Sequence, residues 1–127
     1  MESWSNNALG ILCVSDYEPL RITRAHVLRR NGFDVQAVDS QGLEELVDLR
    51  CFSLVIVCQS IPAERAAEIA GKTKRLSQGT LLLRVQLTPR REEALIFDAV
   101  MEGTSMPQQF VTSVMRMFER PQSFRSA

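Results

Sequence analysis

Short apolar runs separated by helical patterns are the main signal in this chain. The run at residues 8–14 is continuous, which is typical of a strand buried on both faces of a sheet. Further strands are predicted at residues 54–58 and 81–87. Apolar and polar residues alternate at Phe33, Val35 and Ala37, which favours a strand nearer the sheet edge. A fifth strand is predicted at residues 97–101, although residues 94–100 could instead continue a helix.

Helical patterns lie between these strands. Pro19 sets the first turn of the first predicted helix and Gly32 ends it. Ser40 is the predicted cap of the second helix, while Pro62 opens a third that Gly79 ends. The second helix is expected to turn Leu43, Leu46 and Val47 inward. The third is expected to turn Ala66, Ile69 and Ala70 inward.

The last two helices differ in length. Residues 89–96 allow only about two helical turns. Ser105, with Gln108 three residues later, forms a capping box that begins a longer helix. The apolar residues of that helix keep helical spacing and are Phe110, Val111, Val114, Met117 and Phe118. Strand and helix thus alternate five times, which predicts a doubly wound parallel sheet with right-handed crossovers.

Composition narrows the class of protein. A chain of 127 residues with these elements fits one domain. Its 15 basic and 15 acidic residues cancel, which argues against general binding to nucleic acid or to a membrane surface. No apolar run approaches a membrane span, and residues 1–7 lack the apolar region of a signal peptide. Cys13, Cys51 and Cys58 have no CxxC spacing, so we expect reduced thiols in a cytoplasmic protein.

Five segments together carry a family resemblance. Residues 11–19 (ILCVSDYEP) and 31–33 (NGF) resemble the first strand and first helix end of the receiver domain of two-component response regulators. Residues 53–62 (SLVIVCQSIP) are similar to its third strand and the proline that follows. Residues 85–88 (VQLT) and 97–101 (FDAVM) resemble its fourth and fifth strands.

The resemblance covers residues 8–119, which leaves residues 1–7 and 120–127 as short polar tails. It implies a single α/β domain that is doubly wound and CheY-like (flavodoxin-like). In this fold five parallel strands lie in the order 2-1-3-4-5, with helices on both faces of the sheet. The fourth helix is expected to be short.

The resemblance also places a phosphorylation pocket, and most of its chemical groups are missing here. Receiver domains hold Mg²⁺ with two acidic residues and the phosphoacceptor aspartate. The resemblance places Ser15 and Asp16 at the two acidic positions and Cys58 at the position of the aspartate. The threonine position is Thr88, and the lysine position falls near Gly103. One carboxylate beside a thiol is a poor site for a hard ion, and phosphoryl transfer needs cations that neutralise the moving charge. We therefore expect a vestigial pocket with no catalytic residue, no metal and no cofactor.

Cys58 has three interpretations. A phosphatase-like nucleophile would need a C-x5-R loop, but Arg65 gives C-x6-R and His26 lies in mid-helix, away from the thiol. A redox-sensing thiol would gain from the helix N-terminus that follows, because this lowers a thiol pKa. The third and favoured interpretation is a small core residue that replaces an aspartate.

The remaining polar residues are expected to have structural roles. Asp16 is a predicted cap of the helix begun at Pro19, and Thr88 a predicted cap before Pro89. Cys13 is expected to pack in the core. A solvated helix face is expected for Arg21, Arg24, Arg29 and Arg30.

These observations predict a stand-alone pseudo-receiver, which is not an enzyme and which acts by binding another signalling protein or a second copy of itself. Neither nucleic acid nor a membrane is an expected partner. The candidate interaction face, on the fourth helix, fifth strand and fifth helix, contains Met101, Met106, Phe110 and Met115. One alternative is a response regulator that takes part in a phosphorelay by binding a kinase. Another is a small-molecule or thiol redox sensor that uses the pocket around Cys58.

Overall fold

The computed structural model describes residues 10–46, 49–88, 91–103 and 106–119. Five parallel strands form one sheet in the order β2-β1-β3-β4-β5, as the resemblance implied. The strands are β1 (Gly10–Val14), β2 (Asp34–Val38), β3 (Leu54–Val57), β4 (Leu81–Gln86) and β5 (Ala99–Glu102). The alternative helix across residues 94–100 is wrong, because β5 begins at Ala99 and pairs with β4.

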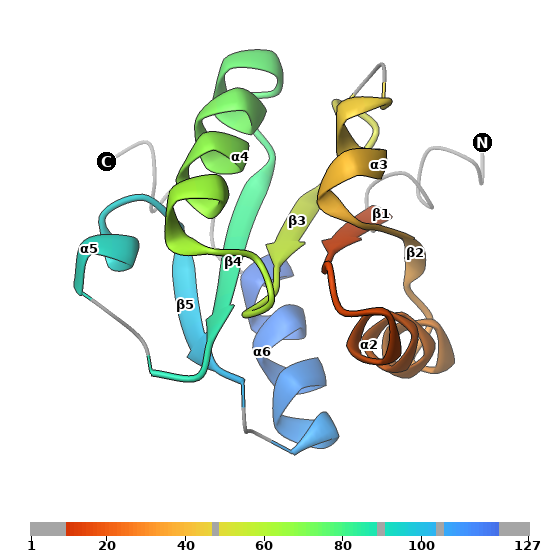
Figure 1. Ribbon diagram of the computed structural model, residues 1–127. Coiled ribbons are helices and arrows are strands. Elements are labelled where there is room, and N and C mark those ends of the chain that lie inside the picture. The colour runs from red at the N-terminus through yellow and green to blue at the C-terminus, as the bar shows by residue number, and fades with distance from the viewer. Residues whose placement is uncertain (1–9, 47–48, 89–90, 104–105, 120–127) are drawn as a thin grey trace.

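Helices cover both faces of this sheet (Figure 1). They are α2 (Glu18–Arg30), α3 (Ser40–Glu44), α4 (Ala63–Leu76), α5 (Arg91–Ala94) and α6 (Pro107–Phe118). The short helix predicted before the fifth strand is α5, which makes a single turn where about two were expected. The chain therefore has the CheY-like, flavodoxin-like fold.

The core has two halves because successive strand residues point to opposite faces. On one face, Ile11, Ile56 and Leu83 pack against buried residues of α2 and α6. On the other, Leu12 and Val57 pack against buried residues of α3 and α4. All four residues of β3 are fully buried, as expected for a central strand.

Helix ends are where the predictions are least accurate. Gly32 does end α2, and its positive φ of 92° explains why a glycine stands there. Asp39, and not Ser40, caps α3, since its Oδ1 accepts the Gly42 N–H at 2.6 Å. α4 already ends at Leu76, before the predicted Gly79.

The capping residues predicted for the last helix are shifted by one position. Met106 is the N-cap of α6, and its main-chain N–H donates to Gln109 Oε1 at 3.1 Å. This is the reciprocal bond that was predicted between Ser105 and Gln108. Ser105 lies outside the described residues, as do Val47, Pro89 and both predicted tails.

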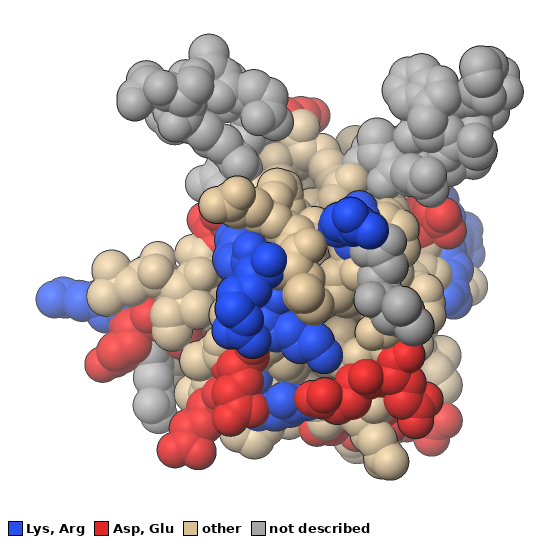
Figure 2. Space-filling model, turned by 90° about the horizontal axis from the view of Figure 1, so that it is seen from above, with Lys and Arg blue, Asp and Glu red and all other residues tan. Residues whose placement is uncertain are grey.

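Charge is mixed on the face seen from above. Figure 2 shows Lys and Arg side chains gathered near the middle of this face with Asp and Glu bordering them. Adjacent charges of both signs fit the zero net charge of the sequence. Within the described parts of the chain, no helix is long and apolar enough to cross a membrane.

Candidate functional site at the carboxyl ends of the strands

Ser15 and Asp16 follow β1 and are tied to the loop after β3 by Ser60. The Oγ atoms of Ser15 and Ser60 lie 2.9 Å apart, and the Asp16 N–H donates to Ser60 Oγ at 2.9 Å. Ser15 is fully buried, and its Oγ also contacts the main chain of Tyr17. A position that carries an acid in receiver domains is therefore a structural hydroxyl here.

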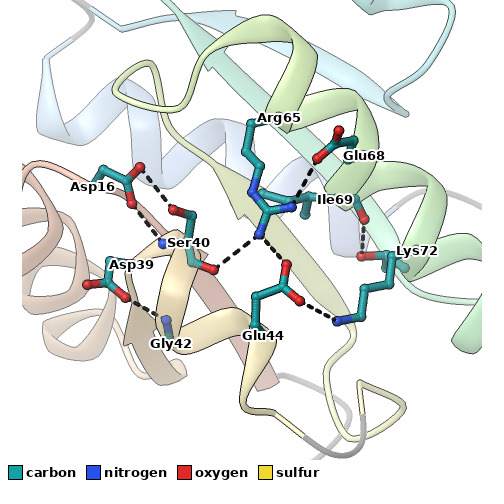
Figure 3. A network of polar contacts seen from close by, with 10 residues as sticks. Asp16, Asp39, Ser40, Gly42, Glu44, Arg65, Glu68, Ile69 and Lys72 are labelled. Atoms are coloured by element: carbon teal, nitrogen blue, oxygen red, sulfur yellow. Dashed lines mark hydrogen bonds and ion pairs between the residues drawn. The ribbon is translucent and has the colours of Figure 1, made fainter.

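The Asp16 carboxylate binds the start of α3 and does not cap α2. Its Oδ1 accepts the Ser40 N–H at 2.7 Å and its Oδ2 accepts the Ser40 hydroxyl at 3.1 Å (Figure 3). The N-cap of α2 is Tyr17, which makes no side-chain cap bond. The prediction that Asp16 caps α2 is therefore wrong. The ends of β1 and β2 are adjacent in the sheet, which brings the start of α3 within reach of the Asp16 carboxylate.

Arg65, the arginine of the C-x6-R spacing, turns away from Cys58 and towards α3. Its guanidinium pairs with Glu44 and donates to Ser40 O at 3.3 Å, and Lys72 lies 3.7 Å from the same Glu44 carboxylate (Figure 3). The bond from Arg65 is the main cause that lowers the pKa of Glu44. This network joins α3 to α4, so a phosphatase-like loop around Cys58 has no arginine from this position.

Cys58 lies one residue beyond β3 and is fully buried. Its Sγ is 3.9 Å from the Sγ of Cys13 on the neighbouring strand β1. Both thiols belong to the core that α2 and α6 cover. Core packing was expected for Cys13, whereas the direct contact between the two sulfurs was not.

The two thiols have opposite pKa shifts. The hydrogen bond from Cys13, with contributions from Arg24 and Arg84, lowers the pKa of Cys58 to about 7. The same hydrogen bond and burial raise the pKa of Cys13 well above its ordinary value. The contact between the sulfurs thus moves the two pKa values apart, as expected for two coupled acids.

Arg24 was expected on a solvated helix face and is instead buried against the strand ends. Its Nη1 donates to Gln59 Oε1 at 2.8 Å and its Nη2 to Gly103 O at 3.3 Å. The guanidinium carbon also lies 5.3 Å from the centre of the Phe110 ring. Arg24 thus supplies a fixed cation from α2 at a pocket whose lysine position, near Gly103, has no positive charge.

A side chain at Gly103 would meet the end of the Gln59 side chain. A Cβ atom at this position would lie 2.8 Å from Nε2 of Gln59, closer than non-bonded carbon contacts allow. The Gly103 N–H donates to Gln86 O at 2.7 Å, which holds the main chain against the end of β4. A side chain here would have to displace Gln59 and with it the partner of Arg24.

A second buried arginine fixes the loop after β3 from the opposite face. Arg84 in β4 is fully buried and donates to Cys58 O at 2.9 Å and to Ile61 O at 2.8 Å. Its Nε pairs with Glu93 Oε2 at 2.8 Å, and Gln86 donates to the same oxygen. Glu93 Oε1 has no partner among the described residues. Arg84 therefore fastens the one-turn helix α5 and the Cys58 main chain to the same strand.

The other predicted site residues do not all gather. Thr88 is exposed after β4, and Pro89, the helix start expected beside it, lies outside the described residues. Phe110 is buried in the core and so is not a surface residue. Met115 lines a groove with Val27 of α2, whereas Met101 lines a groove beside β5. Met101 and Phe110 also line a common groove between α2, β5 and α6, and Met106 is exposed.

The residues that organise this site were missed in the sequence, although two left a signal. Arg84 interrupts an apolar run that predicts a buried strand, and a charge there requires a buried partner. Arg24 stands four residues after Leu20 and four before Leu28, on the apolar stripe of its helix. Ser60 and Gln59 carry no local pattern that distinguishes them from loop residues.

These residues do not fit a magnesium site. No group of three or more His, Cys, Asp or Glu residues is placed to hold a metal within the described ranges. The one carboxylate of the predicted set, Asp16, is already occupied by two donors from Ser40. A hard cation prefers several oxygen ligands, and the thiol of Cys58 supplies none.

Solved structures are similar to this chain over nearly their whole length. The receiver domain of HemR from Leptospira biflexa aligns with a TM-score of 0.77 at 18% identity, covering 89% of this chain and 96% of its own. CheY4 of Vibrio cholerae aligns with 0.71 at 18%, covering 84% and 96%. A pilus assembly-related protein of Burkholderia pseudomallei aligns with 0.72 at 17%, covering 90% and 92%.

Sequence comparisons give no closer assignment. No protein-family model matches the chain, and no curated protein matches it. Identities of this size show the fold alone. The chain therefore has the fold of a response-regulator receiver domain.

Proposed function

We propose that this chain is a receiver-like signalling module that acts through protein–protein association and is not phosphorylated on an aspartate. The observation that carries the proposal is Cys58, a fully buried thiol at the phosphoacceptor position, with the fixed cation of Arg24 beside it. A buried thiol with its own sulfur partner has neither the carboxylate nor the exposure that phosphoryl transfer needs.

The rest of the pocket supports the same proposal. The polar groups of the pocket are hydrogen-bonded within the protein. Ser15 bonds with Ser60, Asp16 with Ser40, and the main chain of Gly103 with Arg24 and Gln86. Catalysis needs polar groups that are oriented towards a substrate and are not already hydrogen-bonded within the protein. We therefore assign no enzymatic activity to the pocket.

An exposed apolar surface near α5 supports association with a partner. Leu87 after β4 is 56% exposed, and Leu95 and Ile96 after α5 are 85% and 41% exposed. Single exposed apolar side chains are ordinary, and Leu87 lies at the carboxyl end of β4, away from the other two. Leu95 and Ile96 are adjacent just after α5 and form the candidate contact surface. This surface lies on the β4–β5 connection, which carries the short helix α5.

The fold itself does not require phosphotransfer. The Burkholderia pseudomallei structure similar to this chain is described as pilus assembly-related, and the same fold thus occurs outside proteins named as response regulators. Function on a shared fold is set by the site. The partner that we propose is another signalling protein or a second copy of this chain.

Two alternatives follow from particular observations. The receiver fold would allow the chain to bind a kinase and take part in a phosphorelay without accepting phosphate. The 3.9 Å contact between Cys13 and Cys58 would instead suit a thiol sensor. Both alternatives are signalling functions. The first depends on a surface that binds a kinase, and the second on the pocket around the two thiols.

The proposal is tested by variants that place a charge on each candidate surface. We expect Leu95→Glu to abolish association, because an unpaired charge buried in an interface is costly. Met115→Glu tests the α6 surface in the same way. Ile22→Glu on α2 is the matched control, since Ile22 is also a large apolar residue and is 58% exposed. Self-association is read by light scattering over a concentration series, and partner binding by pull-down from the native host.

Cys58→Ala separates association from sensing. If the module works by docking, this variant should associate like the wild-type protein, since a small buried thiol is replaced by a methyl group. Loss of association in Cys58→Ala, with Leu95→Glu and Met115→Glu unaffected, would establish the sensor in place of the docking module. A wild-type protein that stays monomeric and captures no partner reproducibly would also overturn the proposal.

A further inference from the structure

The turn between α5 and β5 is anchored at its first end by Glu93. This residue is 4% exposed, and its Oε2 accepts hydrogen bonds from Arg84 at 2.8 Å and from Gln86 at 2.9 Å. The main-chain carbonyl of Glu93 accepts the N–H groups of Ile96 at 3.1 Å and of Phe97 at 2.9 Å. One buried residue therefore holds the turn through both its side chain and its main chain.

The second end of the turn is anchored by Phe97 and Asp98. Phe97 is buried in the half of the core that α3 and α4 cover. Asp98 accepts the Leu82 N–H at 2.8 Å and pairs with Lys74 of α4 at 3.3 Å. Leu95 lies between the two anchors and is the most exposed of the large apolar residues in the described parts of the chain. An apolar side chain held in this way is preorganised, which lowers the cost of ordering it when a partner binds.

Arg84 fixes the position of the Glu93 carboxylate. The arginine is fully buried, and its Nη1 and Nη2 donate to Cys58 O at 2.9 Å and to Ile61 O at 2.8 Å, which leaves Nε for Glu93. Glu93 Oε1 has no hydrogen-bond partner among the described residues. Well-packed apolar side chains often stabilise a fold as much as a buried ion pair does, so stability alone does not explain a pair with an unsatisfied oxygen. Its directional bonds instead set the place of the turn relative to the sheet.

We propose that Arg84 and Glu93 are positioning residues for the contact surface of Leu95 and Ile96. Both members of the pair are buried, so they act on a partner only through the turn that they hold. The inference rests on the association proposed above and extends it to residues that lie outside the surface. Loss of the pair should weaken association by freeing the turn, even where the fold and both apolar side chains are kept.

The double variant Arg84→Met/Glu93→Leu tests the proposal, because it replaces the buried pair with apolar side chains and so separates orientation from stability. Amide hydrogen exchange followed by NMR in the full chain should be about tenfold faster or more at Ile96 and Phe97. The amide of Leu12 in the central strand β1 reports global opening and serves as the reference. Light scattering over a concentration series, or the pull-down described above, should show association weakened about tenfold or more.

Ile69→Val is the matched control. Ile69 is buried in the same half of the core as Phe97 and takes no part in the ion pair, so this variant should exchange and associate like the wild-type protein. Gln86→Met provides a second arm if the double variant does not fold. It removes only the second donor to Glu93 and should still speed exchange at Ile96 and Phe97 several-fold.

Unchanged exchange at Ile96 and Phe97 in a folded variant overturns the proposal. Faster exchange with wild-type association overturns it equally, in a protein whose association Leu95→Glu abolishes. Wild-type association in Leu95→Glu would instead reject the contact surface itself. That failure is distinguished from the other two because it leaves the exchange rates of the ion-pair variants untouched.

Discussion

The Sγ atoms of Cys13 and Cys58 lie 3.9 Å apart on the sheet face that α2 and α6 cover. The two residues are not directly opposite one another, since Cys13 pairs with Ile56 and Cys58 follows two residues later. Their thiols meet because residues two apart on a strand point to the same face. Cys58 is thereby held in the core and away from solvent.

The first prediction concerns the Cys58 thiolate. In a Cys51→Ser protein, which lacks the exposed cysteine, thiolate absorbance should appear with a midpoint near pH 7, because the pKa of Cys58 is lowered to about 7. Arg24→Met should move this midpoint upwards, since Arg24 is one of the groups that lower the pKa. Arg30→Met in the same background should leave it unchanged. A midpoint above pH 9 in the Cys51→Ser protein would contradict the described environment of the pair.

The second prediction is the effect of this pair on stability. Because the pKa of Cys58 is lowered in the folded state, the folded state binds fewer protons than the unfolded state at pH values above 7. The contribution of the Cys58 thiolate to the free energy of unfolding therefore grows above pH 7 and is lost as the pH falls through 7. The raised pKa of Cys13 acts in the opposite direction at higher pH. Between pH 7 and about 8.5, the free energy of unfolding should therefore increase more in the Cys51→Ser protein than in Cys51→Ser/Cys58→Ala. The expected difference is on the order of 1 kcal/mol.

Urea unfolding at several pH values measures this difference. At pH 6, where the thiolate contributes little, Cys58→Ala should cost only about 1 kcal/mol. Parallel curves for the two proteins across the whole range would show that the Cys58 thiol does not ionise in the folded state.

The third prediction concerns the buried pair of Arg84 and Glu93. Glu93→Gln should lower the free energy of unfolding by about 3–5 kcal/mol, because it leaves the guanidinium of Arg84 without a counter-charge. Arg84→Met should cost a similar amount. The double variant should be more stable than the sum of the single effects predicts, since it buries no unpaired charge. Additive losses in a double-mutant cycle would show that the pair does not interact energetically.

The fourth prediction separates the structural role of Asp16 from metal binding. Asp16→Ala should lower the free energy of unfolding by about 1 kcal/mol, because the α3 N-terminus loses both acceptors of Ser40. Asp39→Ala, which removes the side-chain cap of the same helix, should have an effect of similar size. Millimolar Mg²⁺ should not raise the melting temperature of the wild-type protein, as it would if it bound the native state tightly. A rise that Asp16→Ala abolishes would demonstrate a metal site.

Sequence pattern predicted the sheet better than the site. The alternation of strands and helices follows from the apolar runs, and the strand order follows from the family resemblance, which rests on spacing over the whole chain. Helix caps depend on single side chains, so Asp39 and Met106 were missed by one position each. These local choices are decided by small energies that the pattern does not resolve.

The site could not be predicted because its contacts join residues far apart in the sequence. Arg24 meets Gly103 across 79 positions and Cys13 meets Cys58 across 45. A helical arginine is commonly solvated, and only the packing of α2 against α6 places Arg24 at the strand ends. Arg84 was also missed, although a charge inside an apolar strand requires a buried partner.

Intact mass after incubation with acetyl phosphate and Mg²⁺ tests the central claim most directly. A receiver domain that retains its aspartate serves as the positive control in the same buffer. We predict that the mass of this protein stays unchanged, because Cys58 is a buried thiol and Asp16 is committed to Ser40. A stoichiometric phosphoryl adduct, whether acid-stable or removed by hydroxylamine, would contradict the account.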